Sequence, residues 1–224
     1  MEAILRRVPL FAGMADDDWS ALAPRLTTVQ ISKGDVVFHE GDPGDCLFVV
    51  LEGKVKISRT APDGRENLLA ILGPGDLLGE LSLFDAIDRT ATATALTQLR
   101  LSQLDDIDFH AYISDRPAVA TELLRVLARR LRDTNAAMAD LVFTDVPGRV
   151  AKALLSLAGR FGEETSDGLR VSHDLTQEEL AQLVGASRET VNKALSDFAT
   201  RGWLRLEGKS VLILDQPRLS RRAR

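Results

Sequence analysis

The spacing of apolar residues changes once along this chain, and that change restricts the folds open to it. From about Thr28 to Leu104, apolar and polar residues alternate with a period of two, which predicts β-strands. Glycines interrupt the alternation at short intervals, at positions 34, 41, 44, 53, 64, 73, 75 and 79. Short strands at this spacing favour an antiparallel roll or barrel over βαβ units, with short helices beside it.

Between about Arg116 and Phe143 the period becomes that of a long helix. A seam recurs there at steps of three and four, formed by Leu124, Leu127, Leu131, Thr134, Met138 and Leu141. Such a heptad seam buries itself against another helix, and the helix length favours a parallel homodimer. The alternative is an amphipathic helix that lies on its own roll.

The segment 145–148, Asp-Val-Pro-Gly, then interrupts the helical pattern. Proline lacks an amide donor and glycine loosens the backbone, so we expect an interdomain hinge here. Apolar residues from Val150 to Phe161 indicate another helix, and residues 162–168 a polar loop. We therefore predict an α+β chain of three parts: an antiparallel β-roll at residues 1–115, a dimerisation helix at 116–144 and a winged helix-turn-helix at 145–224.

Two short helices joined by a glycine are predicted within the C-terminal segment. Thr176 and Glu179 have the spacing of a capping box, which opens a helix expected over Leu180 to Val184. Gly185 ends this helix and Ser187 caps the next one. The second helix has a buried stripe of Val191, Ala194, Leu195 and Phe198. Helix, glycine turn and helix within about twenty residues predict a helix-turn-helix.

The outward face of the second helix carries side chains that can read base edges. Arg188 can fork onto guanine O6 and N7, Glu189 can accept from cytosine N4, and Lys193 can reach guanine or phosphate. The alternative is a solvated surface with a Glu189–Lys193 pair at i,i+4.

Positive charge is concentrated at the C-terminal end of an acidic chain. The net charge is −5, yet residues 1–144 hold 15 basic and 22 acidic side chains, and the remaining residues hold 13 and 11. Residues 203–206 and 211–214 flank a polar turn and predict a β-hairpin wing. The chain ends in arginines that either touch phosphates or are solvated: Arg218, Arg221, Arg222 and Arg224.

A glycine-rich turn has the character of a small-anion site. Residues 73–76, Gly-Pro-Gly-Asp, precede Gly79 and Glu80, and Arg89 follows a short loop. Backbone amides at the glycine and at a short helix starting near Glu80 can approach a phosphate, and Arg89 supplies the countercharge. Glu80 can accept from a ribose hydroxyl. The alternative is a structural ion pair between Glu80 and Arg89.

Composition argues against several other classes of protein. Cys46 is the only cysteine, so the chain forms neither an intrachain disulfide nor a cysteine-ligated iron–sulfur cluster. No stretch reaches the ~20 apolar residues of a membrane helix, and we expect a cytoplasmic protein. His39, His110 and His173 are scattered and expected at the surface, so we predict neither a metal site nor an enzyme.

The residues of the two candidate sites resemble those of a known family. Residues 79–82, Gly-Glu-Leu-Ser, with residues 89–91, Arg-Thr-Ala, resemble the phosphate-binding cassette of cyclic-nucleotide-binding domains. Residues 185–191 resemble the recognition helix of the cyclic-AMP receptor protein (catabolite activator protein) family, and residues 142–150 are similar to its actinobacterial branch. The resemblance covers nearly the whole chain in the same order.

This resemblance implies a cyclic AMP site. Glu80 would hold the ribose 2′-hydroxyl, and Arg89 with nearby amides the cyclic phosphate. Thr134 and Asn135 would contact adenine, with Asn135 reaching across from the partner subunit. The implied ligand residues are Gly79, Glu80, Leu81, Ser82, Arg89, Thr90, Ala91, Arg130, Thr134 and Asn135. Ala91 stands where other actinobacterial members can carry serine, which removes one phosphate contact.

The resemblance also implies binding of palindromic double-stranded DNA with TGTGA-like half-sites. The expected DNA contacts are Thr176, Ser187, Arg188, Glu189, Thr190, Asn192, Lys193, Arg205 and Lys209. Lys193 stands where the enterobacterial protein has arginine, so it lacks the bidentate fork. A second copy of the chain and RNA polymerase are the expected protein partners, and no membrane is expected.

The sequence therefore predicts a cyclic-AMP-responsive homodimeric transcription regulator. Nucleotide bound at the roll and the dimer helix would reorient the helix-turn-helix through the hinge. One alternative is a regulator of the same fold with another effector or none. Another is a cyclic-nucleotide-binding module that regulates a partner protein, against which the segment from Thr176 to Phe198 argues.

Overall fold

The computed structural model describes residues 2–6, 8, 11, 14–85, 87–114 and 116–223. The chain forms two compact units: Met1–Arg65 with Leu69–Arg132, and Glu66–Leu68 with Asp133–Arg224. One long helix, α5 (Pro117–Phe143), contributes to both. The domain limits inferred from the sequence remain predictions, and Asp115 at the first limit lies outside the described residues.

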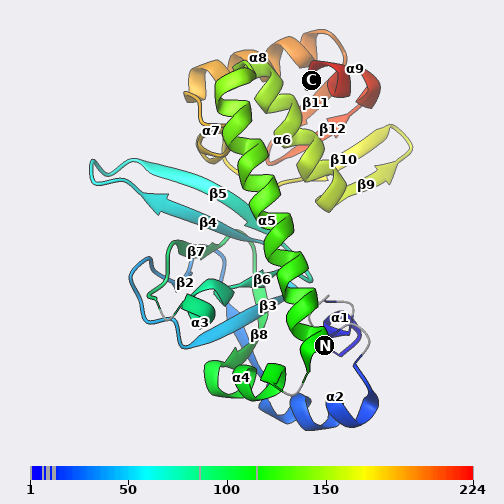
Figure 1. The fold of residues 1–224 in the computed structure, drawn as a ribbon. Helices are drawn as coiled ribbons and strands as arrows, with labels where there is room; N and C mark the ends of the chain where they lie inside the picture. The colour runs from blue at the N-terminus through cyan, green and yellow to red at the C-terminus, as the bar shows by residue number, and fades with distance from the viewer. Residues whose placement is uncertain are drawn as a thin grey trace. The chain divides into compact units, whose positions relative to one another are not determined.

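The N-terminal unit is built on a β-roll (Figure 1). Its strands are β1 (Thr27–Ile31), β2 (Val36–Phe38), β3 (Cys46–Glu52), β4 (Val55–Thr60), β5 (Glu66–Leu72), β6 (Leu77–Leu78), β7 (Thr92–Ala95) and β8 (Leu99–Asp105). One sheet has the order β1-β8-β3-β6 and the other β2-β7-β4-β5. The pairs β1–β8, β3–β8, β3–β6, β2–β7 and β4–β7 are antiparallel.

Strand β3 is buried on both faces because its side chains pack into two separate hydrophobic clusters. Successive side chains of a strand point to opposite faces. One face places Leu47, Val49 and Leu51 in a cluster with Leu104 and Phe109. The other face places Cys46, Phe48 and Val50 in the cluster that fills the roll. This central strand therefore reads as continuously apolar.

Short helices accompany the roll, as the sequence predicts. They are α1 (Glu2–Leu5), α2 (Asp16–Leu22), the 3-10 turn η1 (Ala23–Arg25), α3 (Glu80–Asp85) and α4 (Asp106–Ser114). The first turns of α5 pack on this unit, with Leu123 buried and with Val119 and Leu127 against the same cluster. For this stretch of α5, packing on its own roll is therefore the observed arrangement.

The C-terminal unit is a winged helix-turn-helix. It contains α6 (Val146–Phe161), β9 (Gly162–Thr165), β10 (Gly168–Ser172), α7 (Gln177–Val184), α8 (Arg188–Thr200), β11 (Leu204–Glu207), β12 (Ser210–Ile213) and α9 (Gln216–Arg222). Its sheet has the order β11-β12-β10-β9. The predicted α+β class, with a roll, a long helix and a winged helix-turn-helix, is confirmed.

Three expected details of local structure in this unit are wrong, whereas the hinge role of residues 145–148 stays a prediction. The interruption after α5 is only Thr144 and Asp145, because α6 already begins at Val146 with Pro147 and Gly148 in its first turn. Proline is compatible with a helix start, where its missing amide has no intrahelical acceptor to lose. Residues 162–168 are not a loop but a hairpin, in which β9 pairs with β10. Helix α7 also begins three residues earlier than Leu180.

No helix in the part of the chain that the structure describes is long and apolar enough to cross a membrane.

Candidate functional site

The turn that opens α3 brings the backbone close to a guanidinium. Gly79 has a φ of +82°, a conformation that residues with an L side chain rarely adopt. A Cβ atom there would lie 2.3 Å from Nη1 of Arg89, closer than contact distance allows. Only glycine fits, and Glu80 follows it as the first residue of α3.

Arg89 is held by the protein on several sides. Its Nη1 donates to the carbonyl of Gly79 at 2.8 Å, and its Nη2 to the carbonyl of Cys46 at 2.7 Å. The guanidinium carbon lies 4.5 Å from the ring centroid of Phe38. Nε of Arg89 is buried without an acceptor among the described residues. Because a buried donor without a partner is costly, this nitrogen is suited to an acceptor that arrives with a ligand.

Glu80 is the second buried charged residue of the site. Its side chain is 1% exposed and its carboxylate accepts from Nη1 of Arg130 on α5. Arg130 also donates to the carbonyl of Leu77. The ion pair of Glu80 is thus with Arg130, one of the ligand residues that the resemblance implies, and not with Arg89 as the structural alternative requires.

The remaining cassette residues differ in exposure. Ser82 and Ala91 are buried, whereas Leu81 and Thr90 are exposed. The neighbouring Cys46 is buried, and this burial raises the pKa of its thiol to about 11, although the nearby Arg89 acts in the opposite direction. The donors and the carboxylate of this site suit a sugar phosphate: a guanidinium with one open donor, a close-packed glycine turn and a fixed carboxylate.

The seam on α5 is largely exposed in the single chain. Leu124, Leu131 and Met138 are 66%, 62% and 67% exposed, and Leu141 is also exposed. Thr134 and Asn135 are exposed on the same helix, in the C-terminal unit. Large apolar side chains at heptad spacing rarely remain in water, so this stripe is a surface that needs a cover.

The helix-turn-helix forms as its local signals predict. Thr176 accepts from the amide of Glu179 at 3.1 Å, and Glu179 accepts from the amide of Thr176 at 2.8 Å, which completes the capping box. Gly185 ends α7 in the left-handed region, with φ +62°. A Cβ there would lie 2.8 Å from Cδ2 of Leu141. Ser187 caps α8 by accepting from the amide of Thr190 at 3.2 Å.

Helix α8 separates a buried stripe from an open face. The stripe is the predicted one, Val191, Ala194, Leu195 and Phe198. Arg188, Glu189 and Lys193 are exposed, and no ion pair or side-chain hydrogen bond joins them to the described residues, so the alternative Glu189–Lys193 pair is not formed. Asn192 is half-buried, and its Oδ1 has no hydrogen-bond partner among the described residues.

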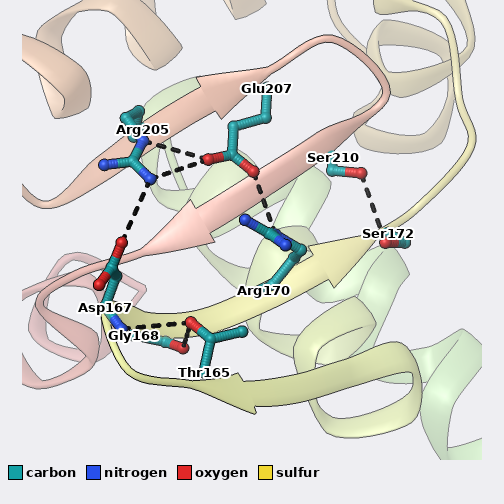
Figure 2. A network of polar contacts seen from close by, with 8 residues as sticks. All are labelled: Thr165, Asp167, Gly168, Arg170, Ser172, Arg205, Glu207 and Ser210. Atoms are coloured by element: carbon teal, nitrogen blue, oxygen red, sulfur yellow. Dashed lines mark hydrogen bonds and ion pairs between the residues drawn. The ribbon is translucent and has the colours of Figure 1, made fainter.

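The wing is a tight hairpin whose two expected DNA residues differ. Lys209 lies at its tip, and its ammonium has no ion-pair partner among the residues described. Arg205 is held by Glu207, which accepts from its Nε at 3.1 Å and its Nη2 at 3.0 Å (Figure 2). Thr176, Ser187 and Thr190, the other expected contacts, are exposed.

Within the C-terminal unit, polar contacts join the end of α5 to α6 and to the end of α7. The sequence analysis did not predict these contacts. Asp140 accepts from Lys152 and from Thr144 Oγ1, and Arg149 donates to the carbonyls of Thr144, Val184 and Gly185. The hydrogen bond from Lys152 lowers the pKa of Asp140. An acidic residue at a helix end followed by basic residues in the next helix is the only sequence signal for these contacts.

The arginine tail is mostly paired. Arg218 pairs with Asp215 at 3.2 Å, and Arg222 with Asp145, the N-cap of α6, at 2.5 Å. The hydrogen bond from Arg222 lowers the pKa of Asp145. Arg221 lies in a shallow pocket with Trp203, and Arg224 lies outside the described residues.

The expected surface position of His173 is wrong. Its side chain is buried in the C-terminal unit, and its Nδ1 accepts from the amide of Leu175 at 3.1 Å. Within the described ranges, no group of three or more His, Cys, Asp or Glu is placed to hold a metal ion.

Comparison with known proteins identifies both units. Residues 28–116 match the family described as cyclic nucleotide-binding domain, and residues 148–222 match the Crp-like helix-turn-helix domain. The chain is 60% identical over 224 residues, 100% of both chains, to a Mycobacterium tuberculosis protein named CRP-like cAMP-activated global transcriptional regulator. It is 38% identical over 198 residues, 88% of each chain, to the cyclic AMP receptor protein of Thermus thermophilus.

A solved structure gives the same fold with a different effector in its name. The c-di-GMP responsive global regulator CLP of Xanthomonas campestris is similar with a TM-score of 0.75 and 26% identity, covering 89% of this chain and 99% of that one. The relatives are transcription regulators rather than enzymes. With its nucleotide-binding roll, its helix-turn-helix and 60% identity along its whole length, the chain belongs to the cyclic-AMP receptor protein family of transcription regulators.

Proposed function

We propose that this chain is a cyclic-AMP-responsive homodimeric regulator of transcription that binds palindromic DNA with TGTGA-like half-sites. The observation that carries the proposal is the buried Arg89, whose Nε has no acceptor among the described residues and lies beside a glycine turn and a buried Glu80. In this proposal residues 1–115 bind the nucleotide, residues 116–144 pair with a second copy, and residues 145–224 bind DNA.

The nucleotide is held by the cassette and by α5. Arg89 and the amides near Gly79 and Thr90 bind the cyclic phosphate, while Glu80, held by Arg130, accepts from the ribose 2′-hydroxyl. Leu81, Ser82 and Ala91 complete the wall of this site. Thr134 and Asn135 bind the adenine, and Asn135 acts on the partner subunit's nucleotide.

The second copy covers the exposed stripe of α5. A stripe at heptad spacing fits a helix with the same spacing, and an identical chain supplies one. Thr134 is the polar member of the stripe, so a nucleotide bound beside it also changes the dimer contact.

The exposed face of α8 enters the major groove of DNA. Arg188, Glu189 and Lys193 are exposed and have no side-chain partner among the described residues, so they are available to base edges. Thr176, Ser187, Thr190, Asn192, Arg205 and Lys209 position the unit on the backbone and beside the bases. Two copies place two such helices about one DNA turn apart, ~34 Å. RNA polymerase is the proposed protein partner of the DNA-bound dimer.

A second effector deserves a direct comparison because of one observation. The regulator CLP has the same fold and is named for its response to c-di-GMP. The fold by itself therefore does not select cyclic AMP. The selection in our proposal rests on Glu80, Arg89, Thr134 and Asn135.

The test is a mobility-shift titration of the full chain with a palindromic TGTGA-containing duplex and a shuffled duplex, with and without cyclic AMP. We expect cyclic AMP to tighten binding to the palindrome more than to the shuffled duplex. Calorimetric titrations with cyclic AMP, cyclic GMP and c-di-GMP identify the effector, and sedimentation gives the oligomeric state. Equal DNA affinity with and without all three nucleotides would overturn the proposed regulation.

A further inference from the structure

The outer face of the wing sheet carries a row of four charged side chains linked by polar contacts (Figure 2). Glu207 on β11 accepts from Arg205 through Oε1 and from Nε of Arg170 on β10 through Oε2, at 3.1 Å. Asp167, in the β9–β10 turn, lies 3.8 Å from Nη2 of Arg205. Both carboxylate oxygens of Glu207 are thus engaged by guanidinium groups of two different strands.

Strand register explains how Glu207 reaches both arginines. Arg205 pairs with Leu212 on β12, and Leu212 pairs with Arg170 on β10, so the two arginines flank one strand on the same face. Alternate residues of a strand share a face, so Glu207 projects beside Arg205. Its carboxylate spans the gap over the central strand.

The network changes what the wing offers to a polyanion. The two arginines and two carboxylates together carry no net charge. A carboxylate paired with an arginine also occupies the guanidinium donors that a phosphate would bind. Lys209 at the hairpin tip has no such competitor among the described residues. The wing therefore presents Lys209 as an unpaired cation among the described residues, and Arg205 as a cation that is already paired with carboxylates.

We propose that Glu207, assisted by Asp167, is an internal competitor of DNA phosphate for Arg205 and thereby limits the affinity of the wing for DNA. This inference rests on the proposed function, because it assigns Arg205 to the DNA backbone. The competition acts on every sequence alike, since phosphate contacts carry no base information. Glu207 thus keeps binding to unrelated DNA weak while α8 reads the bases.

A purely structural role for the network makes a different prediction. Leu212 lies in the register row between the two arginines and is completely buried, and the stems of long charged side chains can cover an apolar neighbour. If the network served only to cover Leu212, loss of the Glu207 charge would change the melting temperature and leave DNA affinity unaltered.

The experiment measures binding of the cyclic-AMP-bound full chain to a shuffled duplex and to the palindrome over a range of salt concentrations. In Glu207→Gln we expect affinity for both duplexes to rise about threefold to tenfold at low salt. The slope of log K against log salt steepens by about one, because one more guanidinium neutralises a phosphate. Asp167→Asn gives a smaller change in the same direction, and it decides the question if Glu207→Gln does not fold.

The roll offers a closely matched control in Glu40. Its Oε1 accepts from Nε and Nη2 of Arg59, at 2.9 and 2.7 Å, as Glu207 does from Arg205. The side-chain exposures are 60% and 31% for Arg59 and Glu40, against 53% and 26% for Arg205 and Glu207. Glu40→Gln changes the net charge equally, and we expect no change in the salt slope.

The double variant Arg205→Ala/Glu207→Gln separates the possible causes. If Arg205 is the group set free, its removal cancels most of the gain, whereas a general charge effect leaves the gain intact and overturns the proposal. An unchanged affinity and salt slope in folded Glu207→Gln overturns it as well. Failure of the proposed function looks different, because the parent itself would then show no preference for the palindrome.

Discussion

The two candidate sites use charged side chains in opposite ways. At the cassette, Glu80 and Arg89 are 1% and 4% exposed and are bonded to the protein. On α8, Arg188, Glu189 and Lys193 are exposed and unpaired among the described residues. A buried charge is stable only with partners, so the cassette residues are fixed before any ligand arrives. The exposed residues of α8 are hydrated, and in the proposed function DNA replaces this water.

Because of this difference, substitutions at the two sites should affect folding stability and binding affinity differently. A change at the cassette leaves buried polar groups without partners, so it affects folding and ligand affinity together. On our proposal, a change on the open face of α8 affects DNA binding alone, because these side chains have no ion-pair or hydrogen-bond partner among the described residues.

Arg89→Leu should have the largest effect and should lower both properties. The variant loses two charge-assisted bonds of ~1.5–3 kcal/mol each and leaves the carbonyls of Gly79 and Cys46 unpaired. We expect calorimetry to show cyclic AMP binding weakened by at least about a hundredfold, together with a lower melting temperature. Arg59→Leu, which breaks an exposed pair, is the control and should change neither measurement much. Unaltered nucleotide affinity in the Arg89 variant would show that the phosphate binds elsewhere.

Glu189→Ala should have a moderate effect confined to DNA. The carboxylate is exposed and has no partner among the residues that the structure describes, so the melting temperature should remain that of the parent. We expect relaxed preference at one base pair of each half-site, worth ~1–3 kcal/mol, in a selection from random duplexes. Glu164→Ala, an exposed carboxylate on β9, is the matched control. If the selected half-site is identical for parent and variant, α8 is not oriented as we propose.

Thr134→Leu should sharpen the comparison, because it separates dimer stability from ligand binding. The substitution completes an apolar seam and should raise the melting temperature, while the lost hydroxyl should weaken cyclic AMP binding by ~0.5–1.5 kcal/mol. The measurement is a thermodynamic cycle in which cyclic AMP and DNA are titrated in both orders, since coupling is reciprocal. A variant with the parent's nucleotide affinity and coupling would make Thr134 a seam residue only.

Lys152→Ala should have the smallest effect. It removes the partner of Asp140, a partly exposed pair worth less than ~1 kcal/mol. The pKa of Asp140 lies below its ordinary value of 3.8 in the folded chain. The pair therefore adds stability above about pH 4, and this contribution disappears as the pH falls through the lowered pKa. Parent and variant should converge in acid melting curves, whereas a constant gap would show that Asp140 does not titrate with this pair.

Several elements are specified by interactions between residues that are close in the sequence. The capping box at Thr176, the left-handed turn at Gly185 and the buried stripe of α8 depend on neighbours within one helical turn, so they could be predicted. The roll and the seam of α5 also follow from repeated spacing. The start of α6 was misread because proline breaks a helix interior but suits its first turn, and the two cases have the same sequence signal.

Tertiary structure alone decided which charged groups meet. Arg89 lies 43 residues from Cys46, and Arg170 lies 37 residues from Glu207. No local pattern ties such pairs together, because sheet register and burial choose the partners. Strand β9 was missed for the same reason, since its Gly-Glu-Glu-Thr sequence has no apolar alternation and becomes a strand only by pairing with β10. The chemistry of each site could be predicted from residue types, but whether a charge is buried and bonded or open to DNA depends on contacts that the folded chain supplies.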